Sequence, residues 1–146
     1  MDSVDMQLLK MLNANARASL SEMGREVGLS ISGVRKRVKL LEKSGMIKGY
    51  TTVIDPRKFG RGVLAFVNIE VDARGVRDVI KTLSRCHEVC ELHQTTGGHA
   101  LLAKVRTKDI ENLKKFVDDR ISVFDSVKSV RTTITMDTFK ESLLNV

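Results

Sequence analysis

The sequence predicts an α+β fold, in which a winged helix-turn-helix is followed by a ferredoxin-like βαββαβ domain. Near the N-terminus two helical patterns, Leu20–Val27 and Ser30–Gly45, are joined by a short turn at Gly28 and Leu29, as in a helix-turn-helix. Further along, apolar runs and amphipathic segments alternate in the order β-α-β-β-α-β. The predicted divisions are residues 1–54 for the helix-turn-helix domain, 55–62 for a linker that holds the only proline, and 63–146 for the βαββαβ domain.

The helix-turn-helix domain is expected to begin with a helix opened by Asp2 and Asp5, because acids suit the positive end of a helix dipole. Ser21 is a candidate N-cap for the second helix. After the third helix, Ile47–Ile54 contains Tyr50 and several β-branched residues. That composition predicts a strand, which would form a short wing or close off the DNA-binding unit.

The third helix, Ser30–Gly45, has two different faces. Ser30 is a suitable N-cap, and Gly45 stands where a left-handed residue commonly ends a helix. Helical spacing predicts an apolar stripe made of Ile31, Val34, Val38 and Leu41. The opposite face carries Ser32, Lys36, Lys39 and Lys43, with Arg35 and Arg37 on its flanks.

This second face is typical of a helix that lies in the DNA major groove. Small side chains allow close approach to base edges, and cations reach phosphates or guanine. We expect Ser32, Gly33 and Lys36 to approach the bases, while Arg35 can reach bases or phosphates. Arg37, Lys39 and Lys43 suit phosphate contacts or intramolecular ion pairs. The predicted partner is double-stranded DNA, and the predicted DNA-binding residues are Ser30, Ser32, Gly33, Arg35, Lys36, Arg37 and Lys39.

The charge of the chain agrees with an anionic partner. The formal net charge is +7, and residues 1–54 carry nine Lys/Arg against five Asp/Glu. No apolar run is long enough to span a bilayer and no cleavable leader is recognisable, so we expect a cytoplasmic protein without membrane contact. The two cysteines, Cys86 and Cys90, are expected to be thiols and not a disulfide framework.

The βαββαβ domain is read from four strand-like runs and two amphipathic helices. In the last run, Val127–Met136, strict alternation places Val127 and Val130 on opposite faces. In the second run, Val89–Thr95, it places Cys90 with Leu92, and Glu91 with His93. Two helices cover only one face of such a sheet, so a homodimer that packs sheet on sheet is expected. The remaining segments are strands at 63–71 and 100–105 and helices at 75–85 and 109–117.

Short motifs also occur in a fixed order along the chain. In the first domain they are Asp2-x-x-Asp5, Leu8-Leu9-x-x-Leu12, Asn15-Ala16-Arg17, Val27-Gly28-Leu29-Ser30, Arg37-Val38-x-x-Leu41-Glu42 and Gly45-x-Ile47-x-Gly49-Tyr50. In the second domain the segment from Val89 to Thr96-Gly97 stands within the β-α-β-β-α-β order. With this ordered set, nearly the whole chain resembles the Lrp/AsnC (leucine-responsive, or feast/famine) family.

The resemblance implies a sequence-specific transcription regulator that dimerises through its sheet domain. Members of the family often assemble into tetramers, octamers or open helical arrays, and many bind an amino acid between dimers. The resemblance also implies an effector-binding turn at Gly97, Gly98 and His99. A two-fold symmetric dimer would read a pseudo-palindromic site with half-sites about one helical turn apart, or a multiple of that.

One departure from the family bears on the effector. The glycine that corresponds to Gly97 is commonly followed by an acid, an aromatic residue and then an Asp that helps to hold an amino group. Here the run is Gly97-Gly98-His99-Ala100. Glycine N–H groups still suit a carboxylate, but Ala100 cannot pair with an ammonium group. The sequence therefore agrees with another amino-acid-like effector, or with none, at least as well as with a free amino acid.

Two other interpretations of the sequence stay open. The run from Cys86 to His99 holds both cysteines and all three histidines, which are usual ligands of zinc and soft metals. A metal-responsive regulator is therefore an alternative, although no metal ligand set and no cofactor is predicted. Some proteins of this architecture act as sirohaem decarboxylases, and His93 and His99 would then be candidate proton donors or contacts to the macrocycle. The basic face of the third helix favours a regulator over such an enzyme.

Overall fold

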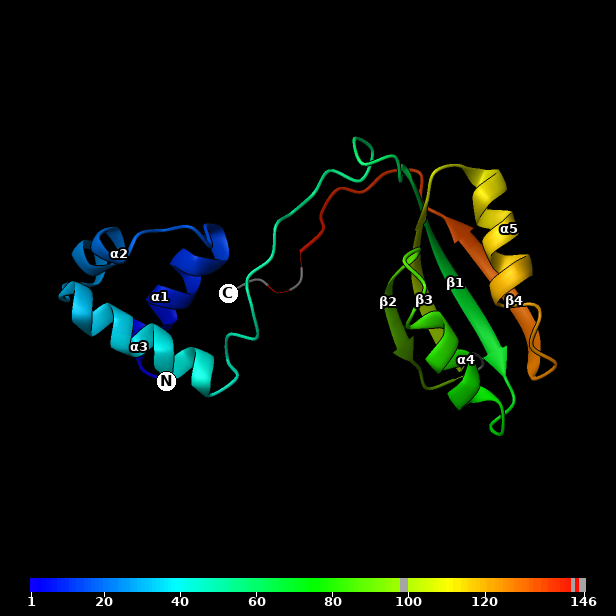
Figure 1. Ribbon diagram of the computed structural model, residues 1–146, viewed down its shortest axis with the longest axis horizontal. Helices are drawn as coiled ribbons and strands as arrows, with labels where there is room; N and C mark the ends of the chain where they lie inside the picture. The colour runs from blue at the N-terminus through cyan, green and yellow to red at the C-terminus, as the bar shows by residue number, and fades with distance from the viewer. Residues whose placement is uncertain (98–99, 143, 145–146) are drawn as a thin grey trace. The chain divides into compact units, whose positions relative to one another are not determined.

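The computed structural model describes residues 1–97, 100–142 and 144. The chain folds into two compact units. The helical unit is Met1–Val53 together with described residues that follow Phe139, and the sheet unit is Ile54–Phe139. Figure 1 labels the helices and strands of both units.

The helical unit consists of α1 (Ser3–Ala14), α2 (Leu20–Val27) and α3 (Ile31–Lys43). All three predicted helices are therefore confirmed. Their core is a cluster in which Leu8, Met23, Val34 and Val38 are buried. The expected N-cap of α2 was wrong, because Ser19 accepts the hydrogen bond from the Glu22 N–H, whereas Ser21 lies within the helix.

The turn between α2 and α3 depends on two glycines. Gly28 ends α2 in the left-handed region, with φ 69°. Gly24 is buried, and its carbonyl accepts the Leu29 N–H at 2.9 Å. A Cβ at Gly24 would lie 2.6 Å from the Leu29 carbonyl oxygen, closer than real contacts allow. The absence of a side chain at Gly24 therefore lets the turn pass closely over α2.

An ion-pair cluster ties the start of α1 to α3. Asp2 and Asp5 form a capping box, in which each carboxylate accepts the backbone N–H of the other residue. The Arg37 Nη1 donates to Asp2 Oδ2 at 2.7 Å and to Asp5 Oδ1 at 2.8 Å. The backbone hydrogen bonds, and then Arg37, lower the pKa of both carboxyls. The guanidinium thus offsets the repulsion between two adjacent carboxylates.

The predicted wing is not present. Ile47–Ile54 forms no strand, and in Figure 1 the described chain leaves α3 as a loop. Val53 is 95% exposed and Ile54 is 60% exposed. β-Branched residues favour an extended backbone, but a strand also needs a partner for its hydrogen bonds, and the described part of this segment pairs with none.

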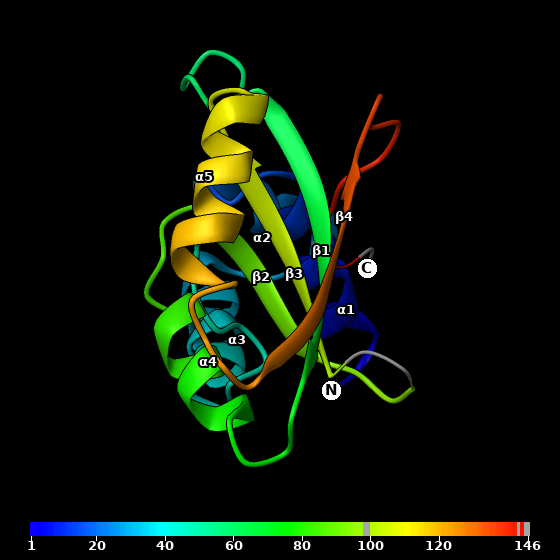
Figure 2. The same cartoon turned by 90° about the vertical axis from the view of Figure 1, so that its right-hand side faces the viewer.

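The sheet unit has the predicted β-α-β-β-α-β order. Its strands are antiparallel and lie in the order β2-β3-β1-β4. The helices α4 and α5 cover one face of this sheet (Figure 2). The elements are β1 (Val63–Val71), α4 (Val76–Leu83), β2 (Val89–Gln94), β3 (Leu101–Thr107), α5 (Ile110–Arg120) and β4 (Val127–Ile134).

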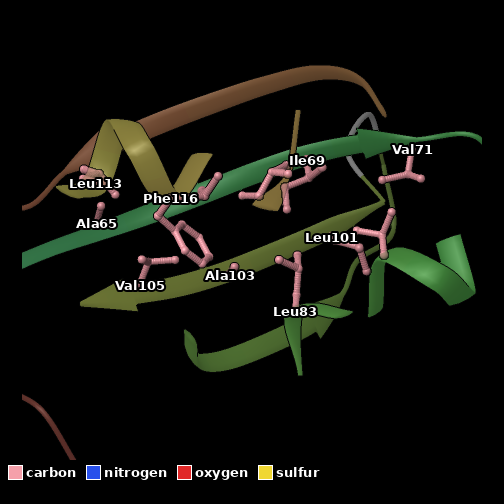
Figure 3. Packing of buried hydrophobic residues seen from close by; sticks show 12 residues of the cluster. Ala65, Ile69, Val71, Leu83, Leu101, Ala103, Val105, Leu113 and Phe116 are labelled. Carbon is pink, nitrogen blue, oxygen red and sulfur yellow. The ribbon is translucent and has the colours of Figure 1, made fainter. Parts of the chain in front are cut away.

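The core of the sheet unit lies between the sheet and its two helices. Ile69 of β1 and Leu101 of β3 are fully buried beneath Leu83 of α4, and Phe116 of α5 fills the space beside them (Figure 3). Alternate residues of β1 and β3 supply this layer, as their predicted periodicity requires.

Two register shifts change which side chains face that core. In β4 a shift opposite Glu70 and Val71 lets both Val127 and Val130 pack on the core cluster. In β2 a shift between Val89 and Glu91 leaves Cys90 exposed, while Leu92 packs on the core. The strict alternation expected for these two strands was therefore wrong, because a bulge adds one residue on one strand only.

No helix among the described residues is long and apolar enough to cross a membrane.

Gly24→Ala is predicted to destabilise the helical unit by about 1–3 kcal/mol, because the new Cβ would push against the Leu29 backbone. Thermal and urea unfolding would measure the change. Gly33→Ala is the matched control, since a Cβ there would meet Ser30 Oγ at 3.4 Å, an ordinary contact. Equal stability of Gly24→Ala and the wild type would contradict the close approach.

The Asp2, Asp5 and Arg37 cluster predicts acid sensitivity of the helical unit. Carboxyls whose pKa is lowered by folding stabilise the folded state above their unfolded pKa, and this stabilisation is lost as the pH falls through and below about 4. Arg37→Ala should therefore lower the stability at pH 7 and reduce its decline towards pH 3. Urea unfolding at several pH values would measure both effects. An unchanged pH profile in Arg37→Ala would exclude this role for the guanidinium.

Candidate nucleic-acid interface

One face of α3 is exposed and carries the predicted DNA-contacting residues. Ser32, Arg35, Lys36 and Lys39 are all exposed, and Gly33 is half-buried. None of the three cations in this set forms a salt bridge with any residue that the structure describes. Their charges are thus available to an external anion.

Ser30 and Arg37 have structural roles in addition to their place on this helix. The Ser30 Oγ caps α3 by accepting the Gly33 N–H at 3.2 Å, and it lies 3.0 Å from Ser32 Oγ. Arg37 is held by Asp2 and Asp5. Of the two uses expected for Arg37, the structure shows the intramolecular ion pair.

The predicted apolar stripe of α3 is only partly correct. Val34, Val38 and Leu41 are buried, but Ile31 at the first turn is 49% exposed. Leu40, which was not singled out, is 56% exposed beside the basic face. A stripe inferred from periodicity assumes a neighbour along the whole helix, whereas α1 and α2 cover only its middle.

Tyr50 contacts α3 through a hydrogen bond that the sequence did not predict. Its O–H donates to Glu42 Oε1 at 2.8 Å, and burial followed by this hydrogen bond raises the pKa of the phenol. Glu42 is the only acid within α3. The contact therefore directs the one negative side chain of the helix towards the following loop.

The predicted effector turn is described only in part. Gly97 has φ 113°, in the region that favours glycine, and the Thr95 N–H donates to the Ala100 carbonyl at 3.0 Å. Gly98 and His99 lie outside the described residues. The turn connects β2 to β3 at one end of the sheet.

The sheet face opposite the helices has a mixed character. Phe66 is exposed on β1, and next to it the Lys104 Nζ donates to Glu91 Oε1 at 2.9 Å. Glu91 also lies 3.3 Å from His93 Nε2. The Lys104 hydrogen bond lowers the pKa of Glu91. In one chain this face has no covering layer among the described elements.

The cysteines occupy different environments. Cys86 packs against the core, and burial raises the pKa of its thiol, whereas Cys90 is exposed on the β2 bulge. Within the described ranges, no three His, Cys, Asp or Glu side chains are grouped as metal ligands would be.

Comparisons with known proteins agree with this geometry. Residues 1–42 match the AsnC-type helix-turn-helix domain, and residues 64–144 match the Lrp/AsnC ligand binding domain. The transcriptional regulator Ptr1 of Methanocaldococcus jannaschii is 36% identical over 97% of this chain and 95% of its own length. The regulatory protein AsnC of Haemophilus influenzae is 35% identical over 92% and 91%.

Solved structures show the same fold. AsnC of E. coli superimposes with a TM-score of 0.92 at 26% identity, over 99% of this chain and 97% of that one. A transcriptional regulator from Neisseria meningitidis, solved as a complex with L-Met, has a TM-score of 0.93 at 23% identity, over 98% and 94%. With both domains matched in order, the chain belongs to the Lrp/AsnC family of helix-turn-helix transcription regulators.

Proposed function

We propose that α3 reads a specific DNA site through Ser32, Gly33 and Lys36, with Arg35 and Lys39 contacting phosphates or base edges. The observation that carries this proposal is an exposed helix face with small residues at its N-terminal end and with cations that form no salt bridge to any residue the structure describes. Arg37 is left out of the proposed contacts, because Asp2 and Asp5 already neutralise it. It positions α3 instead.

We further propose that the working form is a homodimer joined through the uncovered sheet face. The exposed Phe66 and the Lys104–Glu91 pair on that face support this, because apolar surface with an oriented ion pair suits a self-complementary contact. Two copies of α3 related by a two-fold axis would read a pseudo-palindromic site. Assembly of dimers into tetramers or octamers belongs to the same proposal.

A small-molecule effector is proposed to bind at the turn of Gly97, Gly98 and His99. The neighbour from N. meningitidis contains L-Met, which supports a carboxylate-bearing ligand. Ala100 offers no acid to an ammonium group, so we propose a carboxylate without a free α-amino group. Such a ligand would alter DNA affinity only by binding two assembly states unequally.

The chain would act by binding and not by catalysis, in the cytoplasm where its DNA lies.

Lys36→Ala is predicted to weaken binding to operator DNA by about 1–3 kcal/mol, because it removes a contact from the centre of the α3 face. Fluorescence anisotropy across a salt series, with the protein's own upstream region and a shuffled duplex, would measure it. Lys114→Ala is the matched control. It removes the same charge from an exposed lysine of α5, which belongs to the sheet unit. Equal affinities for the wild type and Lys36→Ala would contradict recognition by this face.

The absence of an acidic side chain at Ala100 predicts that a carboxylate without an amino group binds better than an amino acid. The α-keto acid of methionine should raise the melting temperature of the full-length protein more than L-methionine does. Gly97→Val should abolish that rise, because a β-branched residue is strained at this φ and would change the backbone of the turn. Gly60→Val is the matched control, with a left-handed glycine elsewhere in the same unit. Equal shifts with the two ligands would contradict the role of Ala100.

A further inference from the structure

A basic furrow runs across the sheet unit, outside α3 and outside the turn of Gly97. Two adjoining cavities of about 450 Å³ and 360 Å³ form it, and they share Glu88 and Arg120. Its walls come from α4 and α5, which cover the same sheet face (Figure 2), and from the chain before β1 and after β3. The charged residues that line it are Arg61, Lys81, Arg85, Arg106, Lys108, Lys115 and Arg120, with Asp78, Glu88 and Asp119.

The positive charge of the sheet unit is concentrated in this furrow. Seven Lys or Arg and three Asp or Glu line it. The whole sheet unit, Ile54–Phe139, has fifteen Lys or Arg and twelve Asp or Glu. Outside the furrow, acids therefore outnumber cations by nine to eight. An even distribution of charge over the unit would not produce this contrast.

Several furrow cations have no carboxylate partner among the residues that the structure describes. Lys108, Lys115 and Arg120 are exposed and form no salt bridge with any residue in the described part of the chain. Elsewhere in the same unit, Lys104 and Lys128 have carboxylate oxygens at 2.9 Å and 2.6 Å. The seven cations outnumber the three acids in the furrow, so a net repulsion remains among them, and a bound anion would relieve that repulsion.

Other parts of the furrow are held in place. Arg61 Nη1 donates to the His87 carbonyl, and its guanidinium lies 5.7 Å from the ring centre of Phe59. Thr107 is buried, and its hydroxyl donates to the Asp109 carbonyl at 2.9 Å. Phe116, which lies at the base of the furrow, is 5% exposed. The cations therefore surround a rigid base, as preorganised binding requires.

We propose that the basic furrow binds a small molecule that carries two or more phosphate groups. Each cavity falls within the size range of small-ligand sites. Lysine and arginine together are the usual ligands of phosphate oxygens, because ammonium and guanidinium groups form charge-assisted hydrogen bonds with them. The cavities of about 450 Å³ and 360 Å³ are too small to admit a DNA duplex, whereas they can enclose a small phosphate-bearing molecule.

Isothermal titration of the full-length protein with sodium tripolyphosphate, at constant ionic strength, tests the proposal. Lys115→Glu should weaken binding about tenfold or more, since it replaces an attraction by a repulsion. Lys115→Ala should weaken it less. Lys114→Glu is the matched control, because it changes the same charge on the same helix but lies outside the furrow. Equal weakening by Lys114→Glu and Lys115→Glu, or no weakening by either, would overturn the proposal.

Three further arms distinguish the ligand class and the location. Benzene-1,2,4,5-tetracarboxylate, whose charge near neutral pH is close to that of tripolyphosphate, should bind more weakly than tripolyphosphate, and equal binding would overturn the assignment to phosphate. Lys36→Glu should leave tripolyphosphate binding unchanged, whereas its loss would place the anion on α3. Operator binding should show the same salt dependence in Lys115→Glu and Lys114→Glu. A weaker dependence of operator affinity on salt concentration in Lys115→Glu alone would show that the furrow contacts DNA, and it would overturn the small-ligand proposal.

Discussion

The burial of one stripe of α3 is the constraint on which the helical unit depends. Val34 and Val38 pack against Leu8 of α1 and Met23 of α2, and together they form the centre of a small core. A helix that is held along one stripe presents the opposite stripe to solvent. The burial of Val34 and Val38 thus fixes which side of α3 carries its exposed cations.

Electrostatic pairing divides the cations of the chain into two groups. Arg37, Lys104 and Lys128 have carboxylate partners and hold elements together. The cations on the exposed face of α3 and several of those in the basic furrow have none among the described residues. Exposed ion pairs contribute little stability, so unpaired cations cost the fold little, and they leave charge for anionic partners.

The sheet unit shows a similar division between its two faces. The helix-covered face is closed by a continuous apolar layer, whereas the other face carries Phe66 beside the Lys104–Glu91 pair. Bulges in β2 and β4 adjust the outer strands so that Leu92, Val127 and Val130 still reach the core. The covered face stabilises the unit, and the uncovered face supports the proposed dimer.

The sequence by itself determined the helices, the order of helices and strands along the chain, and the family. Helix limits follow from local caps such as Ser30 and from residues such as Gly28, and the type of each element follows from the pattern within its own segment. The choice of Lys36 and its neighbours on α3 as DNA-contacting residues also came from periodicity, and it stays a prediction. Gly97 was assigned to the effector turn from its position in the family motif. The structure describes only part of that turn.

Only the tertiary structure decided the features that need a distant partner. The ion pair of Arg37 with Asp2 and Asp5 joins residues more than thirty positions apart. The close approach at Gly24, the bulges of β2 and β4, the lack of a paired strand at Ile47–Ile54 and the convergence of cations in the furrow likewise depend on neighbours in space. Local sequence sets the backbone preference of a segment, but pairing and burial depend on what the rest of the chain places beside it.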